Sequence, residues 1–302
     1  MLDDRGKTKD LARLTAVRPP PLPIESMVLG KPVAEAADLV PRLFNQARAA
    51  EALAVRKAFG LPVAAAMNEE LRQEVLRDHL LKLCVALPGQ FDLQTGGISP
   101  DWVRDPVAAA HAVFGRAGAP PATPDDFDAY IASDHGTARL LQKIDRCFSP
   151  GEAATGQLQL LSRTSAQGDS AVENSVAGRH ALHPVMRRIA ETRGRGPLWR
   201  TVARLYDIAA CLNDRLPVAI SHEAGNAVVP ASRGTFIVTA ASEAGRVIRF
   251  DRISPTDHML APNGIIDRTL ATLPAIKEGL APLIMEILDP AIPVQLRKPG
   301  QG

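Results

Sequence analysis

The chain has 302 residues, of which 46% are hydrophobic and 23% are charged, a balance that is typical of a globular protein with a substantial core. Its formal net charge of +2 gives no reason to expect binding to nucleic acid or to a membrane. Three widely separated cysteines form neither a disulfide framework nor a CxxC motif. Without the apolar core of a signal peptide or a membrane-spanning run, the chain is expected to be cytoplasmic.

The first residues differ in composition from the rest of the chain. Residues 1–18 mix both signs of charge, and the proline-rich stretch PPPLP follows them. We therefore predict a flexible N-terminal arm over residues 1–23 and one folded domain over residues 24–302.

Helical spacing dominates that domain. Apolar residues recur at steps of three or four, and Ala and Leu supply most of them. The sequence therefore predicts a mainly α fold, a helical core with a small β-hairpin element. The expected helices cover residues 32–60 (with the main helix starting at Pro41), 67–86, 107–116, 127–133, 136–147, 180–192, 198–212, 265–273 and 277–288.

The β-hairpin is expected within residues 230–262. Residues 235–240 (TFIVTA) are rich in β-branched side chains, and residues 246–253 (RVIRFDRI) alternate so that Ile248 and Phe250 should share a face. Residues 242–245 (SEAG) have the composition of a turn, in which the glycine takes a positive φ. The hairpin should therefore bring together the residue before its first strand, Arg233, and the residue after its second strand, Thr256.

This arrangement resembles the C-terminal core of nickel-iron hydrogenase large subunits. There, Pro-Arg-Gly precedes such a hairpin and Pro-Ser/Thr-Thr-Trp-Asn follows it, and the Arg and Ser/Thr donate hydrogen bonds to the cyanides of the active-site iron. The matching residues are Arg233 in Ser-Arg-Gly and Thr256 in Pro-Thr-Asp-His-Met. The resemblance implies that these two residues contact such a group. His258 and Met259 depart from the pattern at the Trp and Asn positions.

The N-terminal metal motif of those subunits, Arg-x-Cys-Gly-x-Cys-x-x-x-His, matches residues 42–51. Arg42 fits, but Phe44 and Ala47 stand at the cysteine positions and Glu51 at the histidine position. Residues 43–51 also match the Leu-Phe-Asn-Leu-Cys-Arg-Ala-Ala-Gln stretch of HupK/HoxV-type hydrogenase expression/formation proteins, except at Ala47 and Glu51.

The C-terminal metal motif, Asp-Pro-Cys-x-x-Cys-x-x-His, matches residues 289–297. Here Ala291 and Val294 replace the cysteines and Arg297 replaces the histidine. A nickel-iron centre needs soft thiolate donors, which none of these side chains supplies. We therefore expect no metal ligands, no catalytic residues and no hydrogenase activity.

The resemblance as a whole is to the HupK/HoxV-type proteins, shortened relatives of the large subunit, and it implies a truncated version of that fold. It also implies a non-catalytic accessory role in maturation of a nickel-iron uptake hydrogenase. No intrinsic cofactor is expected. The implied cargo is a transient iron-dicyanide-carbonyl group, whose thiolate comes from a partner. The expected partners are a HypC-type maturation chaperone and the large-subunit precursor. The alternative is a protein-interaction chaperone that binds the precursor or maturation proteins and never holds metal.

The individual residues also have simpler interpretations. Arg233 can pair with a carboxylate or cap a carbonyl, and Thr256 can be a turn residue or a helix-start residue after its proline. His79, on an apolar helix face, is interpreted as a hydrogen-bonded core histidine. His180 and His183 have chelating spacing, but no third ligand is evident.

Overall fold

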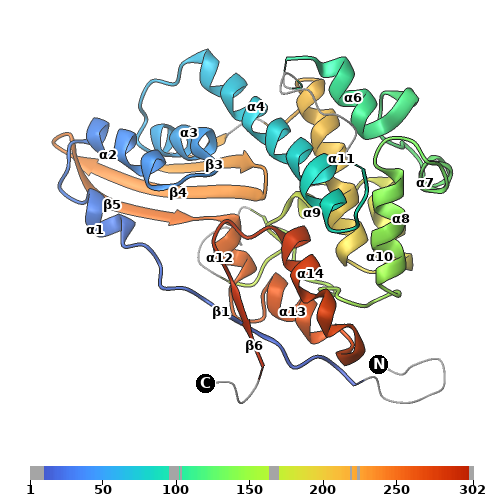
Figure 1. The fold of residues 1–302 in the computed structure, drawn as a ribbon. Coiled ribbons are helices and arrows are strands. Elements are labelled where there is room, and N and C mark those ends of the chain that lie inside the picture. Colours follow the sequence, from blue (N-terminus) through green and yellow to red (C-terminus); the bar gives the residue numbers. More distant parts are fainter. Residues whose placement is uncertain are drawn as a thin grey trace.

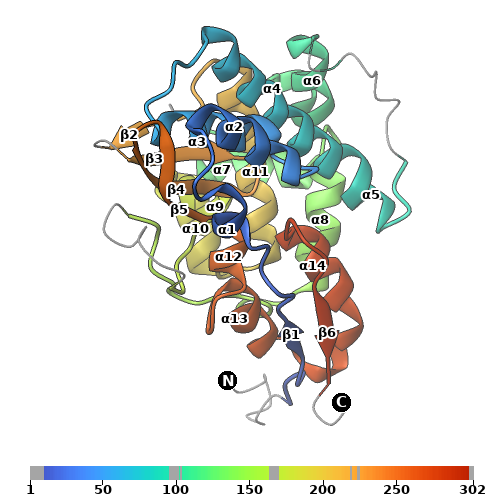
Figure 2. The same cartoon turned by 90° about the vertical axis from the view of Figure 1, so that its left-hand side faces the viewer.

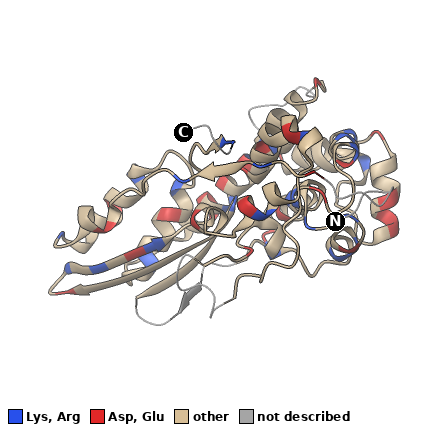
Figure 3. Cartoon of the chain, turned by 90° about the horizontal axis from the view of Figure 1, so that it is seen from below, with Lys and Arg blue, Asp and Glu red and all other residues tan. Residues whose placement is uncertain are grey.

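The computed structural model describes residues 10–94, 102, 104–162, 170–217, 220–222 and 225–298. A small sheet with short helices packed on it forms one side, and a helical body forms the other (Figure 1). None of the helices in the described residues combines the length and apolar composition of a membrane span. Lys and Arg are interspersed with Asp and Glu on both the strands and the helices (Figure 3).

Helices account for most of the regular structure in the described chain. Their bounds are α1 Ile24–Val28, α2 Val33–Leu39, α3 Arg48–Ala58, α4 Ala65–Leu81, α5 Leu87–Gly89, α6 Pro106–Phe114, α7 Pro124–Ala132, α8 Ala138–Cys147, α9 Val176–Arg179, α10 Pro184–Thr192, α11 Pro197–Leu212, α12 Pro255–Met259, α13 Ile265–Ala271 and α14 Ala281–Leu288. Helix α11 is the buried centre of the body, since α4, α6, α8, α9, α10 and α14 all pack against it.

The predicted hairpin is present but belongs to a larger sheet. Strands β2 (Ile220–His222), β3 (Asn226–Ala231), β4 (Gly234–Glu243) and β5 (Arg246–Ile253) are antiparallel and lie in that order. Helix α3 packs on β3 and β4 and so covers one face of the sheet. Strands β2 and β3, which precede the hairpin in the chain, widen it into a four-stranded sheet.

The pairing of β4 with β5 contains a bulge. Ala241 pairs with Arg249, but Ser242 pairs with Val247, so Ile248 has no residue opposite it. As a result Val247 and Phe250 are buried while Ile248 is 55% exposed. The prediction that Ile248 and Phe250 share a face is therefore wrong. Gly245 has the predicted positive φ of 74°, but the turn is shorter than predicted, because Ser242 and Glu243 pair within β4.

The predicted helix from Pro41 to Gly60 is interrupted. A 3₁₀ turn, Val40–Leu43, follows α2, and α3 begins only at Arg48. Between them Phe44 is extended and Ala47 takes a left-handed φ of 56°. The prediction of one helix is thus wrong in the segment that matches the N-terminal metal motif.

The two ends of the described chain pair with each other. Strand β1 (Thr15–Val17) forms a two-stranded antiparallel sheet with β6 (Gln295–Arg297), as Figure 2 shows. Ala12 also donates a backbone hydrogen bond to Leu273. Within the predicted flexible arm over residues 1–23, Leu11, Ala12 and Thr15–Val17 therefore pair with later parts of the chain, and residues 1–9 lie outside the described part.

Several helix boundaries differ from the prediction. The helix over 67–86 becomes α4 followed by a π-helical turn, Lys82–Ala86. The helix over 180–192 is shorter, because His183 caps α10 by accepting from the backbone N–H of Val185. A 3₁₀ helix, Ala275–Leu280, replaces the start of the predicted helix over 277–288. Helices α6, α7, α8, α11 and α13 lie within three residues of their predicted ranges.

Candidate functional site at the ends of the hairpin

A cavity of about 270 Å³ lies where β4 begins and β5 ends. Its lining comes from segments far apart in sequence, namely residues 43–47, 231–236, 252–256 and 291–292, together with Leu22. The interruption before α3 supplies the first segment, the hairpin ends supply the second and third, and the chain after α14 supplies the fourth. The cavity is therefore a product of tertiary structure.

Both predicted binding residues, Arg233 and Thr256, line this cavity. Phe44, Ala47 and Ala291 line it as well, and these are three of the four positions matched to cysteines in the hydrogenase motifs. Val294, the fourth, is not among the lining residues. The structure thus brings together the two residues that the resemblance singled out and three positions that lack thiolates.

Arg233 is held by acidic groups. Its Nε donates to the backbone carbonyl of Asp289 at 2.9 Å, and its Nη2 donates to Asp289 Oδ1 at 3.3 Å. The carboxylate of Asp78 lies 3.8 Å from Nη1. The carboxylate-pairing interpretation is therefore correct, and these contacts also fix the guanidinium at the cavity wall.

Thr256 connects the hairpin to the C-terminal motif. It lies in the short helix α12, and Ser254 and Asp257 form the capping box of that helix. The backbone N–H of Ala291 donates to Thr256 Oγ1 at 3.0 Å. Because Oγ1 accepts this bond, its hydroxyl proton can be donated to a ligand in the cavity. The helix-start interpretation is also correct.

His258 follows in the same helix and is fully buried. Asn174 Nδ2 lies 3.0 Å from His258 Nδ1, which accepts the hydrogen bond because the amide nitrogen can only donate. The Asn174 amide also bonds both backbone groups of Thr235 at the start of β4. His258 therefore fixes α12 against the hairpin.

Arg252 also lines the cavity, and sequence reasoning missed it. Its Nε donates to Glu51 Oε1 at 2.7 Å, and its Cζ lies 4.2 Å from the Phe44 ring centroid and 4.9 Å from that of Phe236. Burial raises the pKa of Glu51, although the charge of Arg252 opposes this shift. The sequence did contain a signal for Arg252. It lies two residues after Phe250 on β5, and alternate residues of a strand point to the same face, so its side chain is expected on the buried face.

A chain of buried polar groups extends from Asp289 away from the cavity. Arg204 Nη2 lies 3.4 Å from Asp289 Oδ2, and Arg204 Nη1 lies 3.0 Å from His79 Nδ1. Since guanidinium only donates, Nδ1 accepts, and His79 Nε2 donates to Asp207 Oδ2 at 2.8 Å. Burial lowers the pKa of His79, so the ring is neutral. His79 is therefore the hydrogen-bonded core histidine that its position predicted.

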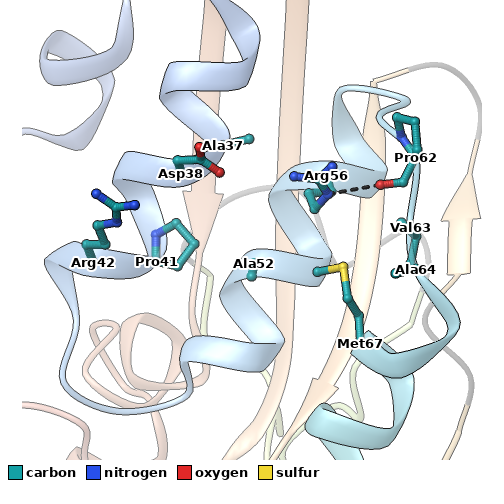
Figure 4. Close-up of a pocket in the computed structure, with 10 residues that line it drawn as sticks. All are labelled: Ala37, Asp38, Pro41, Arg42, Ala52, Arg56, Pro62, Val63, Ala64 and Met67. Atoms are coloured by element: carbon teal, nitrogen blue, oxygen red, sulfur yellow. Dashed lines mark hydrogen bonds between the residues drawn. The ribbon is translucent and has the colours of Figure 1, made fainter.

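Two other candidate groups lie away from the cavity. Arg42, at the start of the N-terminal motif, lines an open groove of about 590 Å³ with Pro41, Arg56 and Met67 (Figure 4). The second group is the pair His180 and His183. His180 Nε2 lies 2.8 Å from Asp207 Oδ1, and the rings of both histidines lie against Tyr206. Among the described residues, no group of three or more His, Cys, Asp or Glu could hold a metal ion.

No family model matches the chain. The chain is 42% identical over 280 residues to the hydrogenase expression/formation protein HupK of Rhodobacter capsulatus, covering 93% of this chain and 91% of that protein.

Solved structures show the same fold in hydrogenases. The reduced Ni-Fe-Se hydrogenase of Desulfovibrio vulgaris Hildenborough aligns with a TM-score of 0.54 and 13% identity, over 94% of this chain and 96% of that chain. An oxygen-pressurised variant gives a TM-score of 0.56 and 12% identity, over 94% and 93%. At such identity the likeness concerns fold alone. The relative at 42% identity decides the family, and the chain belongs to the HupK family of hydrogenase expression/formation proteins.

Proposed function

We propose that this protein is a non-catalytic scaffold in hydrogenase assembly, which transiently holds an iron-dicyanide-carbonyl group or passes it to the large-subunit precursor. Membership of the HupK family supports an accessory role in hydrogenase formation. The iron group is cargo in this scheme, and its thiolate comes from a HypC-type chaperone. We expect these steps to occur in the cytoplasm.

The observation that carries this proposal is the convergence of Arg233 and Thr256 on one cavity. A cyanide bound to iron keeps a nitrogen lone pair, which accepts hydrogen bonds. Arg233 offers charged N–H donors, and Thr256 offers one hydroxyl donor. Contacts with Asp289 and Ala291 hold both side chains in place before any ligand arrives. The donor set therefore suits the outer face of such a group.

The same cavity does not suit nickel or catalysis. Phe44, Ala47 and Ala291 have no electron pair to donate, so they cannot replace the thiolates that a nickel-iron centre requires. The cavity can therefore surround a metal group only when another protein ligates its metal. This reasoning supports assignment as an accessory protein.

A second candidate function is a protein-interaction chaperone that never contacts the iron group. The observation in its favour is that Arg233 and Thr256 already have partners within the chain. Asp289 and Asp78 compensate the charge of Arg233, and Ala291 bonds the oxygen of Thr256. Under this interpretation both side chains only connect the hairpin to the C-terminal segment.

Infrared spectroscopy separates the two functions. The protein is purified together with a HypC-type partner from cells that make hydrogenase, and the cyanide and carbonyl stretching bands are recorded. The scaffold function predicts bands that disappear in Arg233→Leu and persist in Arg249→Leu, since Arg249 is an exposed arginine of β5. Thermal unfolding of both variants checks that they fold. A stable complex without bands would instead support the interaction-only chaperone.

A further inference from the structure

Arg252 places a positive charge at the side of the cavity where the N-terminal metal motif would supply ligands. Phe44 stands at a cysteine position of that motif and Glu51 at its histidine position. The guanidinium contacts both, with Cζ 4.2 Å from the Phe44 ring centroid and Nε 2.7 Å from Glu51 Oε1. The guanidinium is a planar cation that donates hydrogen bonds and accepts none. The guanidinium of Arg252 thus occupies the side of the cavity where the hydrogenase motif would bind metal.

We propose that Arg252 is a specificity-determining residue that makes the cavity a binding site for small anions with a cyanide-type nitrogen. This inference rests on the proposed function and deepens it, because it states the charge of the ligand and adds a donor that the hydrogenase motifs do not contain. Arg233 lines the cavity from the start of β4 and Arg252 from the end of β5, and Thr256 follows in α12.

The hydrogen bonds of Arg252 leave part of its guanidinium available. Nε and Nη2 both donate to Glu51 Oε1. Nη1 forms an ion pair with Asp257 Oδ2 at 4.0 Å, a separation at which it donates no hydrogen bond. Glu51 thus holds the Nε and Nη2 edge of the guanidinium, and the N–H groups of Nη1 remain available to a ligand.

The surroundings favour an anion over a cation. Glu51 is fully buried and does not line the cavity, whereas Arg252 does, so the cavity presents guanidinium rather than carboxylate. The rings of Phe44 and Phe236 lie against Arg252 and exclude water, which strengthens a charged hydrogen bond. Asp78, Asp257 and Asp289 are the other nearby acids, and Asp78 pairs with Arg233. Asp289 is engaged by Arg233 and Arg204, and Asp257 caps α12.

Thiocyanate is the appropriate probe, because it is a small linear anion with a C≡N stretch that hydrogen bonding shifts. The purified full-length chain is titrated with thiocyanate, and the bound band is followed in the infrared. We expect a saturable bound band in the unaltered protein and in Arg249→Gln. Loss of one charged donor should weaken binding about tenfold or more in Arg252→Gln.

A second variant separates loss of the anion site from misfolding. Arg252→Gln alone leaves the buried Glu51 carboxylate unpaired, whereas Glu51→Gln/Arg252→Gln removes both charges and should fold while still binding thiocyanate weakly. The inference is overturned if the unaltered protein shows no saturable band, or if the double variant binds as well as Arg249→Gln. If the double variant binds thiocyanate as well as Arg249→Gln does, the inference about Arg252 fails but the proposed scaffold function is not contradicted. Arg252-dependent thiocyanate binding, with no cyanide or carbonyl bands in the complex from cells, would remove the scaffold function and keep the anion site.

Discussion

Asp289 binds Arg233 twice, through its backbone carbonyl to Nε at 2.9 Å and through its carboxylate Oδ1 to Nη2 at 3.3 Å. Asp289 also ends α14 in a left-handed conformation, with φ 58°. The same carboxylate faces Arg204 and Lys82, so three cations share it. The first residue of the C-terminal motif has therefore become a structural anchor for the hairpin residue Arg233.

Asp289→Asn should destabilise the fold by about 3 kcal/mol, because it leaves largely buried cations without their shared carboxylate. Asparagine tolerates the left-handed conformation, so backbone strain does not confuse the result. The free energy of unfolding is measured by chemical denaturation. Asp128→Asn, an exposed change on α7, is the control and should have little effect. Equal stability of the two variants would show that Asp289 does not anchor Arg233.

His79 should make stability fall as the pH drops below about 6.5. Burial lowers the pKa of His79 in the folded chain, although Asp207 opposes this shift. Below pH 6.5 the unfolded chain binds a proton that the folded chain does not, so the free energy of unfolding decreases by up to about 1.4 kcal/mol per pH unit. His79→Gln should flatten this slope between pH 7 and pH 5. An unchanged slope in that variant would mean that His79 does not titrate as described.

Gly234→Ala should destabilise the protein by about 2 to 3 kcal/mol. Gly234 follows Arg233 and has a φ of 153°, and a Cβ there would lie 2.6 Å from the carbonyl oxygen of Asn174. The close approach of Asn174 therefore requires glycine at this motif position. Gly89→Ala is the matched control, because a Cβ there meets nothing within 4 Å. Thermal unfolding compares the two, and similar melting temperatures would contradict the argument.

Restoring thiolates alone should give only weak nickel binding. In Phe44→Cys/Ala47→Cys, the guanidinium of Arg252 remains at the wall of the same cavity, next to position 44, and repels Ni²⁺. Adding Arg252→Gln should raise the affinity about tenfold, which is the effect of one nearby like charge in a partly polar site. Thiolate-to-nickel charge-transfer absorption reports the binding. Equal affinities with and without Arg252 would show that its charge does not reach the cavity.

The hairpin and the position of its two end residues could be predicted because the information is local. β-Branched side chains specify β4, and Gly245 specifies the turn. The bulge opposite Ile248 could not be predicted, since it depends on pairing between Ala241 and Ser242 on one strand and Arg249 and Val247 on the other. Strand periodicity alone cannot show where one residue is left over.

The interruption before α3 could not be predicted for a related reason. The carboxylate of Glu74 on α4 accepts hydrogen bonds from the backbone N–H groups of Ala49 and Ala50, at 2.9 and 3.2 Å. A side chain 24 or 25 residues away thus caps the helix, in a role that normally belongs to an adjacent residue. Arg252 was missed likewise, because its partner Glu51 is 201 residues away in sequence.

The pairing of β1 with β6 has a consequence for the order of events during biosynthesis. Residues 291–292 complete the cavity lining, and strand β6 begins only three residues later, where Thr15–Val17 fastens it. The ribosome makes this segment after every other part of the lining, so a partly synthesised chain lacks one wall of the cavity. Any ligand that needs all of the lining must therefore be received after translation has passed residue 297.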